Sequence, residues 1–263
     1  MDNLLEVRDL RVWFPIRRGL FARTVGWVKA VDGVSFDVRR GETLGVVGES
    51  GCGKSTTARA VLGLVKPRSG TISFAGRPSG EWGRREYHRR VQVVFQDPLA
   101  SLNPRHTVRE ILTEGMLYHG LCRLSGARDR AAALLGDVGL PTDILDRYPH
   151  EFSGGQRQRL CIARAIALGP ELLICDEAVS ALDLSIRAQV LELLHELKRK
   201  LGLSLLFITH DLGVVQHVAD RIVVMNRGRI VEQGDCAGVL AHPRDPYTER
   251  LMASVPKIGK PLV

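Results

Sequence analysis

The sequence predicts an α/β fold, and three observations support this class. Over most of the chain, short β-rich runs alternate with runs whose apolar residues recur at helical spacing. Residues 43–47 and 203–209 are almost continuously apolar and have strand length, as expected for strands buried on both faces of a parallel sheet. Finally, 263 residues with 44% hydrophobic and 25% charged content suit one large α/β domain or two small ones, which excludes disorder, collagen and a small disulfide scaffold.

The N-terminal part of the chain is expected to be rich in strands. Glycine and proline separate five β-rich runs, at residues 4–12, 34–38, 43–47, 71–75 and 91–95. One helix is expected among them, beginning near Lys54 and ending before Pro67, because its apolar residues fall on one face. These apolar residues are Ala58, Val61, Leu62 and Val65.

Beyond residue 97 the pattern first becomes helical and then alternates again between strand and helix. Residues 107–140 contain no β-rich run, and we expect an insertion of helices there. The later elements are predicted as a strand at 172–175, a helix at 186–201, a strand at 203–209 and a hairpin of strands 222–225 and 229–232. From Pro243 we expect an irregular tail with a short helix at 248–254.

The net charge does not by itself identify a partner. The chain has 37 Lys and Arg residues against 29 Asp and Glu, a formal net charge of +8. A positive surface favours anions such as phosphates, nucleic acid or an acidic membrane face. The basic residues are scattered through every segment, so a general compositional bias explains the excess better than a designed patch.

We expect a chain that neither crosses a membrane nor is exported. No apolar run approaches the roughly 18 residues that a membrane span needs. The acidic N-terminus lacks the basic and apolar regions of a secretory signal. The cysteines are widely spaced, with no CxxC pair or Cys/His cluster, which predicts a reducing compartment and no cysteine-bound metal.

The most specific motif lies between the strand at 43–47 and the helix that follows. It matches G-x-x-x-x-G-K-[ST] and consists of Gly48, Glu49, Ser50, Gly51, Cys52, Gly53, Lys54 and Ser55, followed by Thr56. Its glycines let successive backbone N–H groups point into one concavity at the positive end of a helix, where polyphosphate binds. In such a site Lys54 reaches the β- and γ-phosphates and the Ser55 hydroxyl ligates Mg²⁺. This phosphate loop alone fits kinases, GTPases and many ATPases.

A second, acidic motif narrows the choice. The apolar run at 172–175 ends in Asp176 and Glu177, and the carboxyl ends of strands in an α/β sheet face the bound nucleotide. We therefore expect Asp176 to hold Mg²⁺ through its water shell and Glu177 to polarise the attacking water as general base. The alternative for both acids is a solvated strand end.

Between these motifs, the segment SGGQRQR at 153–159 directly precedes an apolar-periodic helix. Ser153 is expected to be the N-cap of that helix, and Gly154 and Gly155 allow close backbone approach to a second anion. With the phosphate loop, this signature segment and LLICDE in this order, the chain resembles the ATP-binding subunit of an ABC transporter over essentially its whole length. The resemblance implies a P-loop ATPase core (RecA-like) with an N-terminal antiparallel β subdomain and an inserted α-helical subdomain.

The resemblance also implies how this single domain is divided and which further residues act. The β subdomain plus phosphate-loop core would span 1–96, the helical signature subdomain 97–160, the second part of the core 161–242 and the tail 243–263. Gln96 resembles the glutamine that senses Mg²⁺ and the catalytic water, Asp183 lies in the D-loop, and His210 resembles the switch histidine at the γ-phosphate. Phe14 is near the position that stacks on adenine, with Trp13 and Trp27 as alternatives.

In such proteins two ATPase domains pack head to tail and sandwich two ATP molecules. Ser153, Gly154, Gly155 and Gln156 would then contact the ATP held by a second ATPase subunit, homologous or identical. Hydrolysis, with Glu177 orienting water and His210 stabilising the developing charge, would reopen the pair. The other implied partners are two transmembrane permease subunits and an extracytoplasmic solute-binding protein, with the chain peripheral on the cytoplasmic face of the inner membrane and no nucleic acid bound.

Segments at 96–105, 148–152, 245–251 and 254–256 resemble the oligopeptide, dipeptide and nickel importers. We therefore expect uptake of di- and oligopeptides, with nickel or another small solute as the alternative, because the ATPase does not touch the cargo. Two rivals are a non-transport ABC ATPase that acts on nucleic acid or ribosomes and a catalytically silent nucleotide-binding regulator. The modest helical insertion argues against the first, and Lys54, Glu177 and His210 argue against the second.

Overall fold

The computed structural model describes residues 2–19 and 23–253 of the chain. The tail motif at 254–256 and the last residue of the helix expected at 248–254 lie outside these residues. The chain divides into two compact units. The first unit consists of Met1–Glu6, Asp37–Glu42 and Ile72–Leu206, and the second of Val7–Phe36, Thr43–Thr71 and Phe207–Val263.

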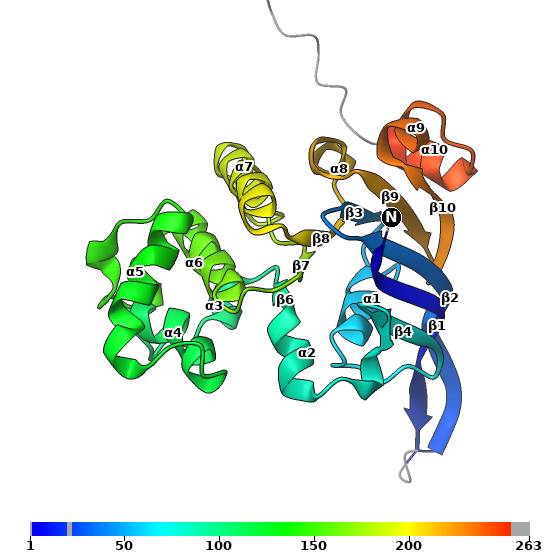
Figure 1. Cartoon of the computed structure of the whole chain (residues 1–263). Coiled ribbons are helices and arrows are strands. Elements are labelled where there is room, and N and C mark those ends of the chain that lie inside the picture. Colours follow the sequence, from blue (N-terminus) through cyan, green and yellow to red (C-terminus); the bar gives the residue numbers. More distant parts are fainter. Residues whose placement is uncertain (1, 20–22, 254–263) are drawn as a thin grey trace, which may run out of the picture. The chain divides into compact units, whose positions relative to one another are not determined.

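Figure 1 shows the strands and helices of both units. The strands that contribute residues to both units are β1 (Asn3–Arg18), β2 (Arg23–Arg39), β4 (Ser69–Phe74) and β8 (Ser204–Thr209). The second unit also contains β3 (Thr43–Val47), α1 (Lys54–Val61), α8 (Leu212–Val218), β9 (Arg221–Asn226), β10 (Arg229–Asp235), α9 (Cys236–Ala241) and α10 (Pro246–Ala253). The first unit also contains β5 (Arg77–Pro78), α2 (Arg84–Arg90), β6 (Val91–Val94), α3 (Pro98–Ser101), α4 (Val108–Tyr118), α5 (Ala127–Asp137), α6 (Gly154–Ile166), β7 (Leu172–Asp176) and α7 (Leu184–Leu201).

The second unit is built on a sheet in the order β10-β9-β3-β8. β3 runs parallel to β9, with Val47 opposite Val224, and β9 and β10 form an antiparallel hairpin. Its turn holds Arg227 and Gly228 at φ of 47° and 80°, the left-handed pair of a type I′ turn, so the predicted hairpin is confirmed. Strands and the helices α8, α9 and α10 share one buried core: Val47, Leu212, Val215, Ile222, Val224, Cys236, Val239 and Tyr247.

The first unit combines the strand order β8-β7-β6 with a group of helices, α3 to α6, drawn in green in Figure 1. β6 and β7 are parallel, with Val94 opposite Cys175. α4 packs against α5 and α6 and begins with a capping box: the Thr107 hydroxyl accepts from the Glu110 N–H, and the Glu110 carboxylate accepts from the Thr107 N–H at 2.7 Å. The helical insertion expected at 107–140 is confirmed.

Two expectations for the N-terminal part are wrong. α1 ends at Val61 instead of just before Pro67, because Leu62 is its C-cap and Gly63 takes a left-handed φ of 70°. α2 was not expected at all, since its sequence RREYHRR buries only Tyr87 and so shows no apolar stripe. Among residues 2–19 and 23–253, no helix combines the length and the hydropathy needed to span a lipid bilayer.

Candidate functional site

The phosphate loop joins β3 to α1 and bends where only glycine fits. Gly48 has a φ of 150°, and a Cβ there would lie 2.2 Å from the Met225 carbonyl oxygen. Gly53 has a φ of 109°, and a Cβ there would lie 2.3 Å from the Ala30 carbonyl oxygen. Both distances are far inside van der Waals contact, so the path of the loop depends on these glycines.

Backbone hydrogen bonds from the β9–β10 turn hold the loop in place. The Gly228 N–H donates to the Cys52 carbonyl oxygen at 2.9 Å, and the Asp32 N–H of β2 donates to the Gly228 carbonyl oxygen at 2.8 Å. The Arg229 guanidinium lies 2.8 Å from the Asp32 carboxylate, and this hydrogen bond holds the pKa of Asp32 below its ordinary value. The turn therefore connects the phosphate loop to β2.

Lys54, the first residue of α1, is only 4% exposed. Its ammonium donates to the Gly48 carbonyl oxygen at 2.7 Å and to the Glu49 carbonyl oxygen at 2.9 Å. The N-cap residue Gly53 supplies no side-chain acceptor to the first N–H groups of α1. An ammonium beside a helix N-terminus without a side-chain cap is a donor set that fits a polyphosphate.

The three candidate adenine-stacking aromatics differ in what already contacts their rings. The Arg68 guanidinium lies 4.7 Å from the ring centroid of Trp13 and 4.6 Å from that of Trp27, and the Lys29 ammonium lies 4.6 Å from that of Trp13. Cations over a ring compete with a stacking base. Phe14 is 40% exposed and Trp27 is 44% exposed, so exposure does not separate these two, and the Arg68 guanidinium over the Trp27 ring is the observation that favours Phe14.

His210 directly follows β8 and belongs to the second unit, as Phe14 and the phosphate loop do. Its side chain is exposed. The next residue, Asp211, caps α8 by accepting from the Gly213 N–H at 2.9 Å and from the Val214 N–H at 3.3 Å. The strand end and the cap together fix the backbone on both sides of His210.

Asp176 and Glu177 lie at the carboxyl end of β7 in the first unit. Asp176 is 7% exposed, and Glu177 is half-buried. The backbone of Glu177 has a φ of 51°, a left-handed conformation that costs a glutamate about 1–3 kcal/mol. Its carbonyl oxygen accepts from both the hydroxyl (2.9 Å) and the N–H (3.1 Å) of Ser180, so a tight turn maintains this conformation.

Gln96 lies near the same edge of the sheet. It is exposed and comes two residues after β6, which is the parallel neighbour of β7, and the carboxyl ends of parallel neighbours lie side by side. The strand order therefore places Gln96 at the same edge of the sheet as Asp176 and Glu177. The next residue, Asp97, caps α3 through a hydrogen bond from the Leu99 N–H at 2.8 Å.

The signature segment begins α6. As predicted, Ser153 is the N-cap: its hydroxyl accepts from the Gln156 N–H, and the Gln156 side chain accepts from the Ser153 N–H at 3.0 Å. The two glycines have different surroundings. A Cβ on Gly154 would meet nothing within 4 Å, whereas one on Gly155 would lie 2.6 Å from Cγ2 of Ile186 in α7. Gly155 therefore serves helix packing, a role that the sequence did not predict.

Asp183 occupies the N-cap position of α7 but makes no side-chain capping hydrogen bond. One further residue at the phosphate loop was missed. The Tyr247 hydroxyl of α10 accepts a hydrogen bond from the Glu49 N–H at 3.0 Å. The two residues are 198 positions apart, and no local pattern in the sequence links them.

Comparisons with known proteins agree with one another. The family model described as "ABC transporter" matches residues 31–180. The chain is 51% identical to the oligopeptide transport ATP-binding protein AppF of Bacillus subtilis, over 98% of this chain and 80% of AppF. It is 52% identical to the oligopeptide transport ATP-binding protein OppF of Salmonella typhimurium, over 96% of this chain and 78% of OppF. CbiO1 of Clostridium perfringens, part of the ABC transporter complex cbiONQ, has a TM-score of 0.78 at 28% identity over 92% of each chain, which confirms the predicted P-loop ATPase fold.

Proposed function

The chain belongs to the ABC transporter family and is an ATP-binding, ATP-hydrolysing domain, and we propose that it energises the uptake of di- and oligopeptides by an importer. The peptide cargo is proposed from the similarity to AppF and OppF. The observation that supports the catalytic part is the phosphate loop, where Lys54 lies at a helix N-terminus that has no side-chain cap.

In this proposal the triphosphate of ATP binds the backbone N–H groups of residues 48–56 and the Lys54 ammonium, and Phe14 stacks on the adenine. Lys54 then exchanges its hydrogen bonds to the Gly48 and Glu49 carbonyl oxygens for phosphate oxygens. The proposed Mg²⁺ ligands are Ser55, Gln96 and Asp176. When bound, Mg²⁺ neutralises charge that develops on the phosphates.

Glu177 is the proposed general base. Its carboxylate orients a water molecule and accepts a proton as the water oxygen attacks the γ-phosphorus, and the bond to the β,γ-bridging oxygen breaks. His210 would stabilise the charge that develops on the γ-phosphoryl oxygens. The turn-held backbone of Glu177 fixes the direction of its Cα–Cβ bond, which supports a base that must hold one water molecule because it limits the positions open to the carboxylate.

We further propose that Ser153, Gly154, Gly155 and Gln156 contact ATP on a second ATPase subunit in a head-to-tail dimer, with Asp183 in the D-loop between them. Two permease subunits and an extracytoplasmic solute-binding protein would complete the importer. The chain would be peripheral on the cytoplasmic face of the cell membrane. The open space at Gly154 supports the partner contact, because a Cβ there would meet nothing within 4 Å.

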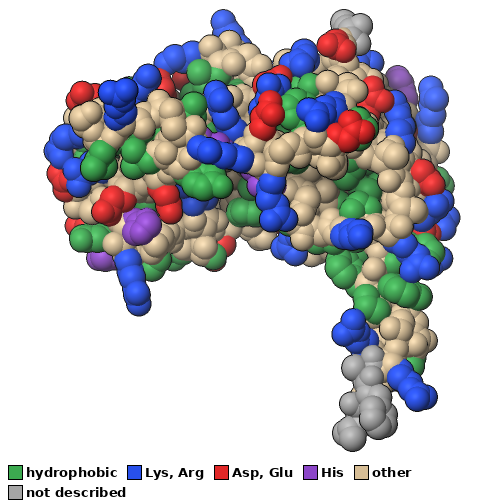
Figure 2. Space-filling model, turned by 60° about the horizontal axis from the view of Figure 1, so that its bottom comes forward, with side chains coloured by type: hydrophobic (Ala, Val, Ile, Leu, Met, Phe, Trp, Pro, Cys, Tyr) green, Lys and Arg blue, Asp and Glu red, His purple; other side chains and the backbone are tan. Residues whose placement is uncertain are grey.

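Nucleic acid is not part of this proposal. Figure 2 shows Lys and Arg side chains distributed over the face in view, with Asp and Glu side chains between them. Nucleic-acid binding needs basic residues concentrated on one face or along one groove. The dispersed charges on this face support a surface whose net charge of +8 reflects composition.

The test of the catalytic proposal is phosphate release by the assembled transporter with Glu177→Gln. Loss of the base should lower turnover by about 100-fold or more while ATP binding is retained. Glu196→Gln, at an exposed position of α7, is the matched control and should leave turnover unchanged. Lys54→Ala should instead lose ATP binding. Near-normal turnover of Glu177→Gln would rule out Glu177 as the base.

The cargo is tested separately, in cells that lack this chain and receive it back on a plasmid. Uptake of a labelled oligopeptide should be restored by the natural chain and not by Glu177→Gln. Restored uptake of Ni²⁺ without restored peptide uptake would show that the cargo proposal is wrong and leave the ATPase proposal intact.

A further inference from the structure

The phosphate loop has a hydrogen-bond partner in the C-terminal helix α10. The Glu49 N–H donates to the Tyr247 hydroxyl oxygen at 3.0 Å. Tyr247 is 7% exposed and packs in the same buried core as Val47, the last residue of β3 before the loop. All three residues belong to the second unit. The hydroxyl is therefore held against the loop by a packed ring.

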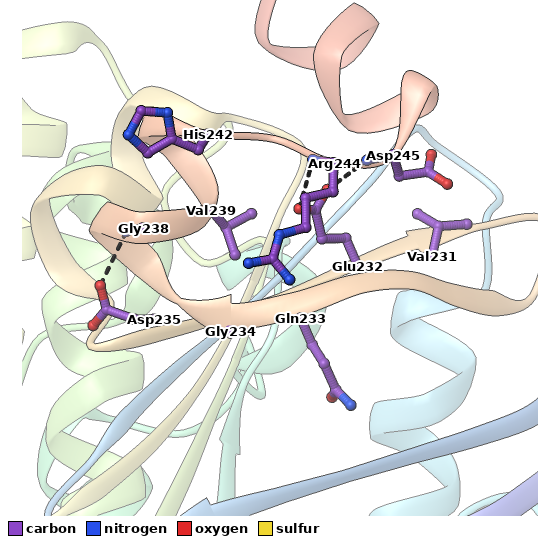
Figure 3. Close-up of a pocket in the computed structure, with 10 residues that line it drawn as sticks. All are labelled: Val231, Glu232, Gln233, Gly234, Asp235, Gly238, Val239, His242, Arg244 and Asp245. Atoms are coloured by element: carbon purple, nitrogen blue, oxygen red, sulfur yellow. Dashed lines mark hydrogen bonds between the residues drawn. The ribbon is translucent and has the colours of Figure 1, made fainter.

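A carboxylate on β10 fixes the start of α10, as the close-up in Figure 3 shows. Glu232 accepts from the Arg244 N–H at 2.9 Å and from the Asp245 N–H at 3.2 Å. Asp245 in turn accepts from the Tyr247 N–H at 2.8 Å. These bonds define the backbone immediately before Tyr247, so the position of its ring does not depend on core packing alone.

The protonation states keep this chain of contacts intact at neutral pH. Burial raises the pKa of Tyr247, so its hydroxyl remains neutral. Burial alone would raise the pKa of Glu232, but contact with the Thr248 side chain and the hydrogen bonds from Arg244 and Asp245 outweigh it and lower the pKa. Glu232 is therefore a charged acceptor, the stronger kind.

The carbonyl group of Glu49 is also held by hydrogen bonds. Its carbonyl oxygen accepts from the Lys54 ammonium at 2.9 Å and from the Cys52 N–H at 3.3 Å. The Glu49 N–H thus donates to the Tyr247 hydroxyl, while the Glu49 carbonyl oxygen accepts from the phosphate-binding Lys54. A shift of Glu49 would move the oxygen that holds the Lys54 ammonium in the loop before a nucleotide binds.

We propose that Tyr247 is a positioning residue for ATP binding, which fixes the Glu49 end of the phosphate loop through its hydroxyl group. The proposal rests on the assignment of the phosphate loop as the ATP site. It gives the C-terminal segment a role in nucleotide affinity: α10 sets the loop geometry without touching the nucleotide.

The test is calorimetric titration of the full chain with a non-hydrolysable ATP analogue and Mg²⁺, comparing the natural chain with Tyr247→Phe. The variant keeps the ring and its packing but removes the acceptor of the Glu49 N–H. We expect the Kd to rise about three- to tenfold, the effect of losing one hydrogen bond. Tyr118→Phe, at a ring that is 67% exposed, is the matched control and should leave the Kd unchanged. Glu232→Ala should raise the Kd in the same direction.

Thermal unfolding without nucleotide shows whether Tyr247→Phe also lowers the stability of the fold, so that a change in Kd can be compared with a change in Tm. An unchanged Kd in Tyr247→Phe, with or without a lower Tm, would overturn the proposal. Lys54→Ala distinguishes a failure of the Tyr247 positioning role from a failure of the ATP-site assignment. If Lys54→Ala abolishes binding while Tyr247→Phe binds normally, only the positioning role fails. If Lys54→Ala binds normally, the ATP site itself is misassigned and the positioning role fails with it.

Discussion

Replacing Gly155 by alanine tests whether this glycine is needed for helix packing. The added Cβ would lie 2.6 Å from Cγ2 of Ile186, about 1 Å inside the optimal separation of two carbon atoms. Ile186 is β-branched and has little rotamer freedom in a helix, so α6 and α7 would have to separate. Such overpacking costs about 1–3 kcal/mol of unfolding free energy. Gly154→Ala, which meets nothing within 4 Å, should be neutral or slightly stabilising.

Urea denaturation of the full chain measures this cost, and a double-mutant cycle assigns it. Ile186→Ala removes the clashing methyl group at a half-buried position. In that background Gly155→Ala should lose most of its penalty, which gives a coupling free energy of about 1 kcal/mol or more. Equal destabilisation in both backgrounds would show that the penalty does not come from Ile186. Full stability of the single variant would refute the packing role altogether.

Two further predictions concern titratable groups. Burial raises the pKa of Cys161 to about 11 and that of Cys175 to about 12. Iodoacetamide at about pH 8 should therefore label half-buried Cys122 first, and these two thiols only after unfolding. Rapid labelling of Cys175 in the folded chain, seen by mass spectrometry, would contradict this. The hydrogen bond from the Thr107 N–H lowers the pKa of Glu110, so the stabilisation from this cap is complete above the ordinary carboxyl pKa and is lost as pH falls from there through the lowered pKa. Glu110→Gln should therefore lower the Tm at neutral pH by a difference that shrinks towards about pH 3; a difference independent of pH would exclude this explanation.

The parts of the fold that were predictable have local signals. The strand at 43–47 is buried at every position, and the glycines that follow it are required by contacts with backbone oxygens. The β9–β10 hairpin was predictable because its turn needs a left-handed pair that ends in glycine. α2 was not predictable, because a helix that buries only Tyr87 has no apolar period to detect.

The parts of the candidate site that were not predictable depend on contacts distant in sequence. The position of Glu177 at the end of an apolar strand was predictable from the sequence. Its left-handed φ of 51° was not, because it results from a turn closed by Ser180. The anion contact of Gly155 stays a prediction, while its packing against Ile186 becomes visible only when α6 and α7 are placed together. Tyr247 required the folded core, since 198 positions separate it from Glu49.

The bond between Gly228 and Cys52 has an entropic consequence for the loop. The phosphate loop is bonded at Cys52 to the β9–β10 turn, and at Gly53 it passes so close to Ala30 of β2 that no Cβ would fit. Ordering one residue costs roughly 1–2 kcal/mol of conformational entropy. A loop already ordered by the fold does not incur this cost when a nucleotide arrives, so more of the contact energy appears as affinity. A longer β9–β10 turn would thus weaken nucleotide binding without altering any residue that the nucleotide contacts.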